Sequence, residues 1–342
     1  MPKKQNDNYE ESIRLGLLKL EGKLDKSWPE LDKQLGNKPD GTRQMTKNYR
    51  RKTGILQGKY QSGRERILVI SDLHIPEHQE ELILDIIRAN KDVHKIFLNG
   101  DIIDCKAVSA WHDSEITILD HELITAHRLL VKIREITNAH IMLIKGNHEQ
   151  RVNTHYARNA KALGSAVVET EILYKLMTGF TIKYEKSRQR IKYEAIENVF
   201  YADARSYLYG DLLLNHPSTF SKNYMQTSQR IWEGKLKDKY PMARVVVVGH
   251  SHQLGMAFIE DDVLLMECGC TCEPARYADN DDRPYRVQQY GYVYLEMQNE
   301  VVDKETIKLV NLGNDNKYHK DHNVPVNFVS FDDGDDDIED EI

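Results

Sequence analysis

Aspartate, asparagine and histidine residues stand directly after five short apolar runs of the sequence. The five endings are Asp72-Leu-His74, Gly100-Asp-Ile-Ile-Asp104, Gly146-Asn-His-Glu149, His216 and Gly249-His-Ser-His252. One aspartate after a strand is more often a helix cap or a turn residue than a ligand. Together, however, these endings supply two aspartates, one asparagine and four histidines, and zinc, manganese and iron bind this mixture of imidazole, carboxylate and carbonyl groups. The pattern therefore predicts one metal site.

The elements that must position these residues are short buried strands. An apolar run bounded by glycine is typical of a strand whose C-terminal end opens into a loop, and α/β proteins bind ligands at that edge of the sheet. The predicted strands that precede the motifs are 67–71, 95–99, 140–145, 212–215 and 244–248. Helices expected over 79–90 and 119–136 alternate with the first three strands, which predicts a parallel sheet covered by helices.

Two other parts of the chain carry weaker patterns. We expect residues 150–210 to be mostly helical and amphipathic. Residues 263–267, 290–296 and 306–310 are expected to form a second group of strands.

In their order, across roughly residues 66–300, the five motifs resemble those of the calcineurin-like metallophosphoesterases. The resemblance implies an α/β fold in which a two-sheet sandwich is flanked by helices. It also implies phosphoester hydrolysis with two divalent metal ions, manganese being the first expectation and zinc, iron or magnesium the alternatives. The family pattern assigns Asp72, His74 and His252 to one ion, Asn147, His216 and His250 to the other, and Asp101 to both as a bridge.

His148 and Asp104 are predicted to act without being metal ligands. In the family, the position of His148 protonates the leaving oxygen or stabilises the transition state, which suits a side chain that titrates near neutral pH. The alternative is an ordinary histidine beside the ligands. Asp104 is predicted to orient a histidine or a loop amide. Because Cys105 and Lys106 follow it, where the serine/threonine protein phosphatases have Arg-Gly, the prediction of a phosphoprotein phosphatase is weakened.

Composition indicates a globular protein, with 40% hydrophobic and 30% charged residues in 342. No run approaches the roughly 18 apolar residues of a membrane span, so we expect a cytoplasmic protein with no membrane association. Three of the four cysteines form Cys268-Gly-Cys-Thr-Cys272. Such a run could bind a soft metal, but it lacks the paired spacing of a structural zinc site, so we expect buried thiols at a strand edge.

Charge is unevenly distributed along the chain. Residues 1–65 contain fifteen Lys and Arg against nine Asp and Glu, a net charge of +6, whereas the whole chain carries −7. This asymmetry suggests one end that contacts nucleic acid and one acidic end. The last twelve residues contain eight acids, so residues 311–342 are expected to be an acidic, disordered tail.

The N-terminal region, residues 1–60, is predicted to be a separate helical module. Ser27 and Glu30 form a capping box, Pro29 stands in the first turn, and Gly36 ends the helix. A basic helix over 42–52 would follow, so the pair resembles a helix-turn-helix whose second helix enters the major groove of DNA. The candidate nucleic-acid contacts are Arg43, Lys47, Arg50, Arg51 and Lys52. A solvated basic face on an accessory helix is the alternative.

Together these patterns predict a catalytic domain over 65–310 that hydrolyses phosphodiester bonds of nucleic acid. The first hypothesis is a DNA nuclease that resembles phage-encoded members of the family, with DNA as its partner. A phosphatase or phosphodiesterase acting on a phosphoprotein or a small nucleotide is the alternative. A non-catalytic DNA-binding regulator is the third hypothesis, disfavoured because every ligand position is occupied by a suitable residue.

Overall fold

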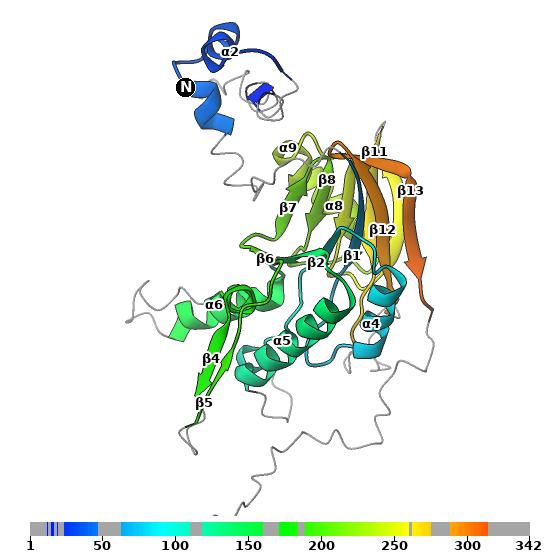
Figure 1. The fold of residues 1–342 in the computed structure, drawn as a ribbon. Coiled ribbons are helices and arrows are strands. Elements are labelled where there is room, and N and C mark those ends of the chain that lie inside the picture. The colour runs from blue at the N-terminus through cyan, green and yellow to red at the C-terminus, as the bar shows by residue number, and fades with distance from the viewer. Residues whose placement is uncertain are drawn as a thin grey trace, which may run out of the picture.

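The computed structural model describes residues 12, 15, 16, 19, 24–46, 63–109, 118–159, 171–183, 189–259, 262–274 and 288–313. Two β-sheets lie against each other, with helices on their outer sides (Figure 1). This mixed α/β arrangement confirms the predicted fold class. None of the described helices is long and apolar enough to cross a membrane.

The first sheet has six strands in the order β13-β12-β1-β2-β3-β6. They are β13 (Val301–Asn311), β12 (Gly291–Gln298), β1 (Arg64–Ile70), β2 (Lys95–Asn99), β3 (His140–Ile144) and β6 (Val199–Ala202). β1, β2, β3 and β6 are parallel, whereas β12 is antiparallel to both β1 and β13. The parallel strands are joined through α4 (Glu80–Ala89), α5 (Leu119–Ile136), α6 (Asn147–Asn159) and α7 (Ile172–Thr178).

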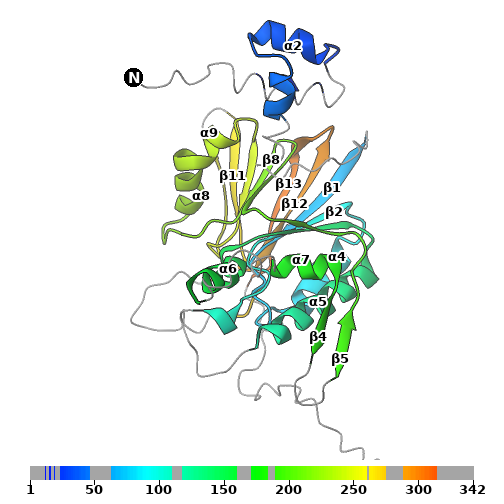
Figure 2. The ribbon, with the colours of Figure 1, turned by 90° about the vertical axis from the view of Figure 1, so that its left-hand side faces the viewer.

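The second sheet has five strands in the order β10-β11-β9-β8-β7. They are β10 (Leu254–Ile259), β11 (Val263–Cys268), β9 (Val245–Val248), β8 (Leu212–Asn215) and β7 (Ser206–Tyr209). β8, β9 and β11 are parallel, and the two edge strands are antiparallel to their neighbours. A π-helical turn, η4 (Trp232–Leu236), joins α8 (Gln226–Ile231) to α9 (Lys237–Lys239), and these helices lie on the outer side of this sheet (Figure 2).

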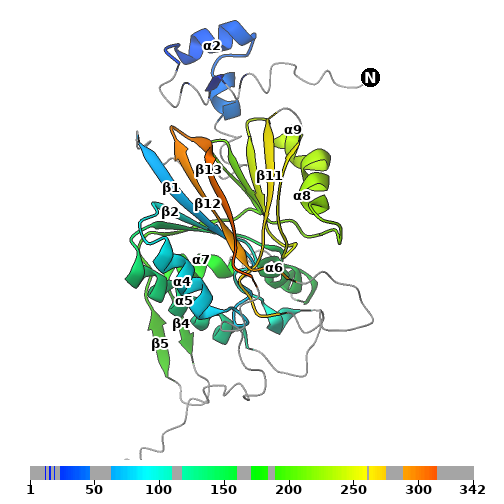
Figure 3. The same ribbon diagram turned by 90° about the vertical axis from the view of Figure 1, so that its right-hand side faces the viewer.

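Alternate residues of each central strand face different cores, because successive side chains of a strand point to opposite faces. Ile67 and Val69 of β1 pack between the sheets, whereas Leu68 and Ile70 pack under α4, α5 and α7. In β9, the residues at 245 and 247 pack between the sheets, and those at 246 and 248 pack under α8 and η4. These central strands are thus covered on both faces, which is why they are continuously apolar. Figure 3 shows α4, α5 and α7 beside the first sheet and α8 and α9 beside the second.

Two of the predictions about secondary structure were wrong. In the described part of 150–210, helix is confined to α6 and α7, and the other elements there are β4 (Phe180–Lys183), β5 (Arg190–Tyr193), β6 and β7. These strands are four residues long, and their alternating apolar and polar residues were too few to separate a strand from a helix by period. Likewise, 290–296 and 306–310 do not form a second group with 263–267, because β12 and β13 extend the first sheet beside β1.

The predicted capping box is present in the N-terminal region. α2 (Trp28–Leu35) begins with Ser27, which accepts a bond from the Glu30 amide while the Glu30 side chain accepts one from Ser27, and Gly36 ends the helix in a left-handed conformation. Residues 41–46 are also helical. The rest of the expected basic helix, including Lys47, Arg50, Arg51 and Lys52, lies outside the described residues, as does most of the acidic tail.

Candidate metal centre

The predicted ligands all stand at the C-terminal ends of strands. Asp72 and His74 follow β1, Asp101 follows β2, and Asn147 follows β3 in the first sheet. His216 follows β8, and His250 and His252 follow β9 in the second sheet. The structure brings all seven together where the two sheets meet.

Asn99, at the end of β2, ties the two sheets together beside the site. Its carbonyl oxygen accepts bonds from Ser71 Oγ at 2.8 Å and from His216 Nδ1 at 2.6 Å. Its side-chain Nδ2 donates to the carbonyl oxygens of Asn215 at 3.3 Å and Val247 at 3.4 Å. The bond to Nδ1 also leaves the other ring nitrogen of His216 facing the centre of the site.

The backbone around the site is strained. Positive φ angles occur at Asp72 (56°), His74 (49°), Asp101 (47°), His250 (73°) and His252 (52°). Such conformations are uncommon for residues other than glycine and cluster at functional sites. Each of these loops turns its ligand inward at a cost in backbone energy, which supports a functional role for the cluster.

Glycines allow the ligand loops to approach one another closely. A Cβ atom on Gly146 would lie 2.1 Å from Asp101 Oδ1, and one on Gly100, whose φ is +83°, would lie 2.3 Å from the His216 ring. The loops after β2, β3 and β8 can therefore meet only with glycine at these positions.

The first group of ligands contains Asp72, His74 and His252. The Nε2 atoms of the two histidines are 3.2 Å apart, and Asp72 Oδ1 lies 3.2 Å from His252 Nε2 and 3.7 Å from His74 Nε2. Nδ1 of His74 is bonded to Asp104 Oδ1 at 2.9 Å, and Nδ1 of His252 contacts the Gln288 carboxamide. Both histidines are thus held by one nitrogen with the other turned inward, as in protein metal sites.

The second group contains Asn147, His216 and His250. Asp101 Oδ2 lies 3.1 Å from His216 Nε2 and 3.8 Å from His250 Nδ1. It also lies 3.9 Å from His74 Nε2 in the first group. Its position between the groups is the one that a bridging carboxylate requires.

The Asn147 carboxamide lies against the second group. With its amide nitrogen turned toward them, it donates to His250 Nδ1 at 2.9 Å, the Pro217 carbonyl oxygen at 3.2 Å and Asp101 Oδ2 at 3.3 Å. Asn147 thus stands among two imidazoles and a carboxylate, the kinds of group that borderline divalent ions bind. The donor set therefore fits a divalent metal ion of the imidazole- and carboxylate-binding class.

The charges of the site are balanced internally. Asp72 and Asp101 are completely buried, and burial alone raises the pKa of a carboxyl group. The neighbouring imidazoles, His216 and His252 for Asp72 and His216 and His148 for Asp101, nevertheless hold both pKa values well below the usual range. Burial lowers the pKa of His216, but Asp101 and Asp72 together raise it to about 9. Positive charge on the imidazoles thus balances the negative charge of the two carboxylates, which bound metal ions would otherwise balance.

His148 lies at the same centre without belonging to either ligand group. Its Nδ1 lies 2.7 Å from Asp104 Oδ1, and its Nε2 lies 3.6 Å from Asp101 Oδ2. Burial lowers the pKa of His148. Asp104 contacts both His74 and His148, so the structure places it where it can orient both rings.

Arg151 is a residue of the site that sequence analysis missed. Its Nη2 donates to His148 Nε2 at 2.7 Å, and its Nη1 donates to the Asp104 carbonyl oxygen at 3.1 Å. It stands three residues after His148 in α6, so the two share one face of that helix. Helical spacing from the Gly146-Asn-His-Glu149 motif could have identified it.

Two buried glutamates that were also missed hold the loops. Glu149 accepts bonds from the amides of Ile102 at 2.7 Å, Ile103 at 2.9 Å and Gly146 at 2.8 Å. Burial, followed by the Asp101 charge, raises the pKa of Glu149 to about 7. Glu122 of α5 accepts from the Cys105 amide at 2.6 Å, and burial, followed by the Asp104 charge, raises its pKa to about 8. These side chains fix the loops after β2 and β3.

Of the predicted nucleic-acid contacts, only Arg43 lies in the described part of the chain. Its side chain is 63% exposed and lies 3.8 Å from Asp40. It belongs to the N-terminal helical region and not to the metal site.

Comparisons with known proteins agree with the site. A family model described as calcineurin-like phosphoesterase matches residues 65–254. No curated protein matches the chain in sequence. Three solved structures are among those to which the chain is similar. A predicted phosphoesterase from Streptococcus pneumoniae is 12% identical, with 73% of this chain and 98% of that chain covered and a TM-score of 0.28.

A metallophosphoesterase from Sphaerobacter thermophilus is 13% identical, and the match covers 72% of this chain and 88% of that chain with a TM-score of 0.32. The zinc complex of Vps29 from Entamoeba histolytica is 10% identical, and the match covers 72% of this chain and 98% of that chain with a TM-score of 0.34. The family model spans more than half of the chain, and its matched segment contains all seven predicted ligands. The chain therefore belongs to the calcineurin-like phosphoesterase family.

Proposed function

We propose that the chain is a two-metal phosphodiesterase that cleaves nucleic acid, with DNA as the substrate, as in phage-encoded nucleases of this family. The observation that carries the reaction type is the position of Asp101 Oδ2, which lies within 4 Å of ring nitrogens of His74, His148, His216 and His250. One buried oxygen is thus shared by both ligand groups and the candidate acid.

Two divalent ions, when bound, supply a nucleophile at neutral pH and neutralise charge on the phosphate oxygens. The protein's own residues hold this arrangement in place. Asp104 fixes the rings of His74 and His148, and Arg151 holds the other nitrogen of His148 until substrate arrives. A phosphate group that draws the Arg151 guanidinium toward itself frees His148 Nε2, and its negative charge favours the protonated imidazole. His148 can then donate that proton to the leaving oxygen.

The proposal of a nucleic-acid substrate has support at the rim of the site. Phe220 and Tyr224, on the segment between β8 and α8, are 49% and 54% exposed. The Phe220 ring centroid lies 5.6 Å from that of the ligand His250. Exposed aromatic rings beside a phosphate site suit stacking with a nucleobase, which contributes roughly 1–3 kcal/mol per base. The basic N-terminal module would add contacts with phosphates farther along the strand.

A second candidate function is hydrolysis of a phosphomonoester on a protein or a nucleotide. Arg151 favours it, because a guanidinium beside His148 suits a terminal phosphate that carries two negative charges. The two candidates differ in the number of ester bonds on the phosphate, which makes them separable by substrate.

The proposed substrate is tested by comparing end-labelled single- and double-stranded DNA with a nucleotide monoester and a phosphopeptide, each with added manganese or zinc. We expect metal-dependent cleavage of DNA and of a chromogenic diester, with slower hydrolysis of the monoesters, and loss of activity in a chelator. Faster hydrolysis of either monoester with intact DNA would favour the second candidate.

Replacing the bridging carboxylate should affect activity more than replacing its neighbour. Asp104→Asn alters the support of two histidines and should lower activity by roughly 10–100-fold, as is usual for partners of metal ligands. Asp101→Asn weakens both ligand groups and should lower it further. Rates are to be compared at matched metal content, and equal rates for wild type and Asp101→Asn would contradict the bridging role.

His148→Ala should leave metal content unchanged and lower the rate by roughly 10²–10⁴-fold, the usual contribution of a general acid. Metal analysis and single-turnover rates are to be measured on the same samples. His155→Ala, an exposed histidine on the same helix, is the matched control and should retain wild-type activity. Loss of one metal equivalent in His148→Ala would make His148 a ligand.

The proposed DNA contacts are tested by changing Arg43, Lys47, Arg50, Arg51 and Lys52 to alanine together. Each phosphate contact adds about 0.9 to the slope of log affinity against log salt for duplex DNA, so this variant should bind DNA more weakly and with a smaller slope. Hydrolysis of the small chromogenic diester should be unchanged. A variant with alanine at the exposed Lys235, Lys237 and Lys239 is the control. An unchanged slope in the first variant would assign the module to another partner.

A further inference from the structure

The cysteine run after β11 passes directly beside the first group of ligands. Cys268 ends β11, and all four cysteines of the chain are buried with free thiols. The Thr271 amide donates to the Asp72 carbonyl oxygen at 3.1 Å. The backbone of Cys272 forms an isolated antiparallel β-bridge with that of His78. The backbone on either side of Cys272 is therefore fixed against the loop that carries Asp72 and His74.

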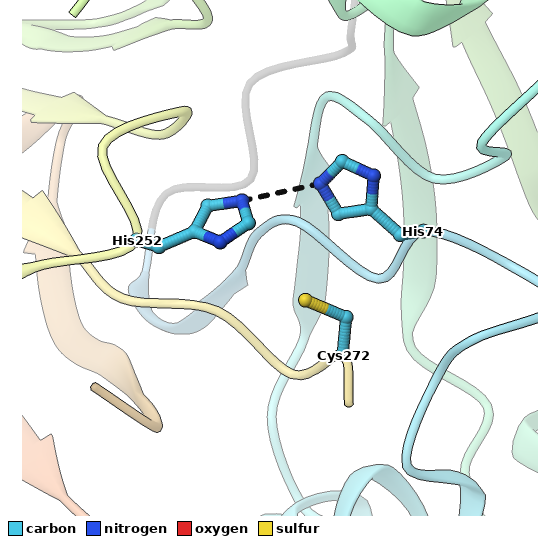
Figure 4. Close-up of side chains that lie close together, drawn as sticks. All are labelled: His74, His252 and Cys272. Carbon is cyan, nitrogen blue, oxygen red and sulfur yellow. Dashed lines mark hydrogen bonds between the residues drawn. The ribbon is translucent and has the colours of Figure 1, made fainter. Parts of the chain in front are cut away.

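The Cys272 sulfur lies close to two predicted metal ligands. One ligand atom each from His74, His252 and Cys272 lies within 4.8 Å of the others. Figure 4 shows the Cys272 sulfur beside the gap between the rings of His74 and His252. The two ring nitrogens that face each other across this gap are 3.2 Å apart. The three side chains come from three different loops, so it is the tertiary packing that brings two imidazoles and a thiol close together.

We propose that Cys272 is a protein ligand of the same metal ion as Asp72, His74 and His252. On metal binding the thiol would lose its proton to solvent, and the resulting thiolate would form the metal–sulfur bond. The inference rests on the metal centre of the proposed function, but it does not depend on the substrate.

The neighbourhood of Cys272 suits this role better than that of Cys270. The Gln288 carboxamide contacts His252 Nδ1, and its Nε2 lies 3.9 Å from Cys272 Sγ. One amide thus supports two adjacent ligands, as outer partners do in metal sites. The Cys270 thiol, in contrast, donates to the Gln289 carbonyl oxygen at 3.7 Å and belongs to none of the potential metal-binding groups in the described part of the chain.

A thiolate would make the two ion positions chemically different. The second group offers only imidazole, carboxylate and amide oxygen, which manganese, iron and zinc accept. Sulfur selects the softer ions of this series and disfavours manganese and magnesium. We therefore expect zinc or iron at the first position, in place of the manganese that the family resemblance suggested there.

The direct test is X-ray absorption spectroscopy of the wild-type protein loaded with two zinc ions. Zinc–sulfur bonds are about 2.3 Å long and zinc–nitrogen or zinc–oxygen bonds about 2.0–2.2 Å. One sulfur for every two zinc ions is the expected result. Two bound ions with only nitrogen and oxygen neighbours would overturn the assignment of Cys272 and leave the proposed function intact. A protein that binds neither zinc nor manganese would overturn both.

A second test uses cobalt and a matched pair of variants. The wild-type cobalt protein should show a sulfur-to-metal charge-transfer band in the near ultraviolet, which Cys272→Ser should abolish and Cys270→Ser should retain. In a competition between zinc and manganese, the ratio of zinc affinity to manganese affinity should be more than about tenfold lower in Cys272→Ser than in the wild type. Even residues that only support a ligand contribute about 10–100-fold to metal affinity. Retention of the band in Cys272→Ser, or its absence from the wild type with cobalt bound, would refute the proposal.

Discussion

The complete burial of two carboxylates, Asp72 and Asp101, is the constraint on which the rest of the site depends. Removing a carboxylate from water costs several kcal/mol even after the protein relaxes, unless opposite charge and hydrogen bonds compensate it. Backbone amides provide part of this compensation, because the His250 amide donates to Asp72 and the His148 amide donates to Asp101. Imidazoles provide the rest. The density of histidine in these loops is therefore a consequence of where the two aspartates lie.

That constraint also explains the unusual backbone. Five ligands have left-handed conformations, each of which costs on the order of 1–3 kcal/mol. The central strands supply the opposing stability, since β1, β2, β3, β8 and β9 are largely buried and fix the starting point of every ligand loop. Asn99, Glu122 and Glu149 then fasten the loops to one another through backbone groups.

The chemistry and the substrate depend on different parts of the molecule. Residues at the join of the sheets form the candidate metal centre, and the family match supports phosphoester hydrolysis as its chemistry. Three further features lie beside the predicted ligands, namely the Arg151 guanidinium beside His148, the exposed Phe220 near His250 and the Cys272 thiol beside His74. These are the positions where binding of substrate and choice of metal can change without rearranging the fold.

The amino-acid sequence alone was sufficient to predict the strands that precede the candidate ligands, because an apolar run followed by polar residues is a local pattern. It also determined the capping box of α2, which spans only four residues. The short strands within 180–209 escaped it, because four residues are too few to establish a period. The placement of β12 beside β1 escaped it, because this pairing joins segments far apart in the chain. The same reason applies within the site. Whether Asp104 contacts one histidine or two, which ring nitrogen of His216 faces Asp101, and that Cys272 lies beside His74 and His252 are decided only when loops from both sheets pack together.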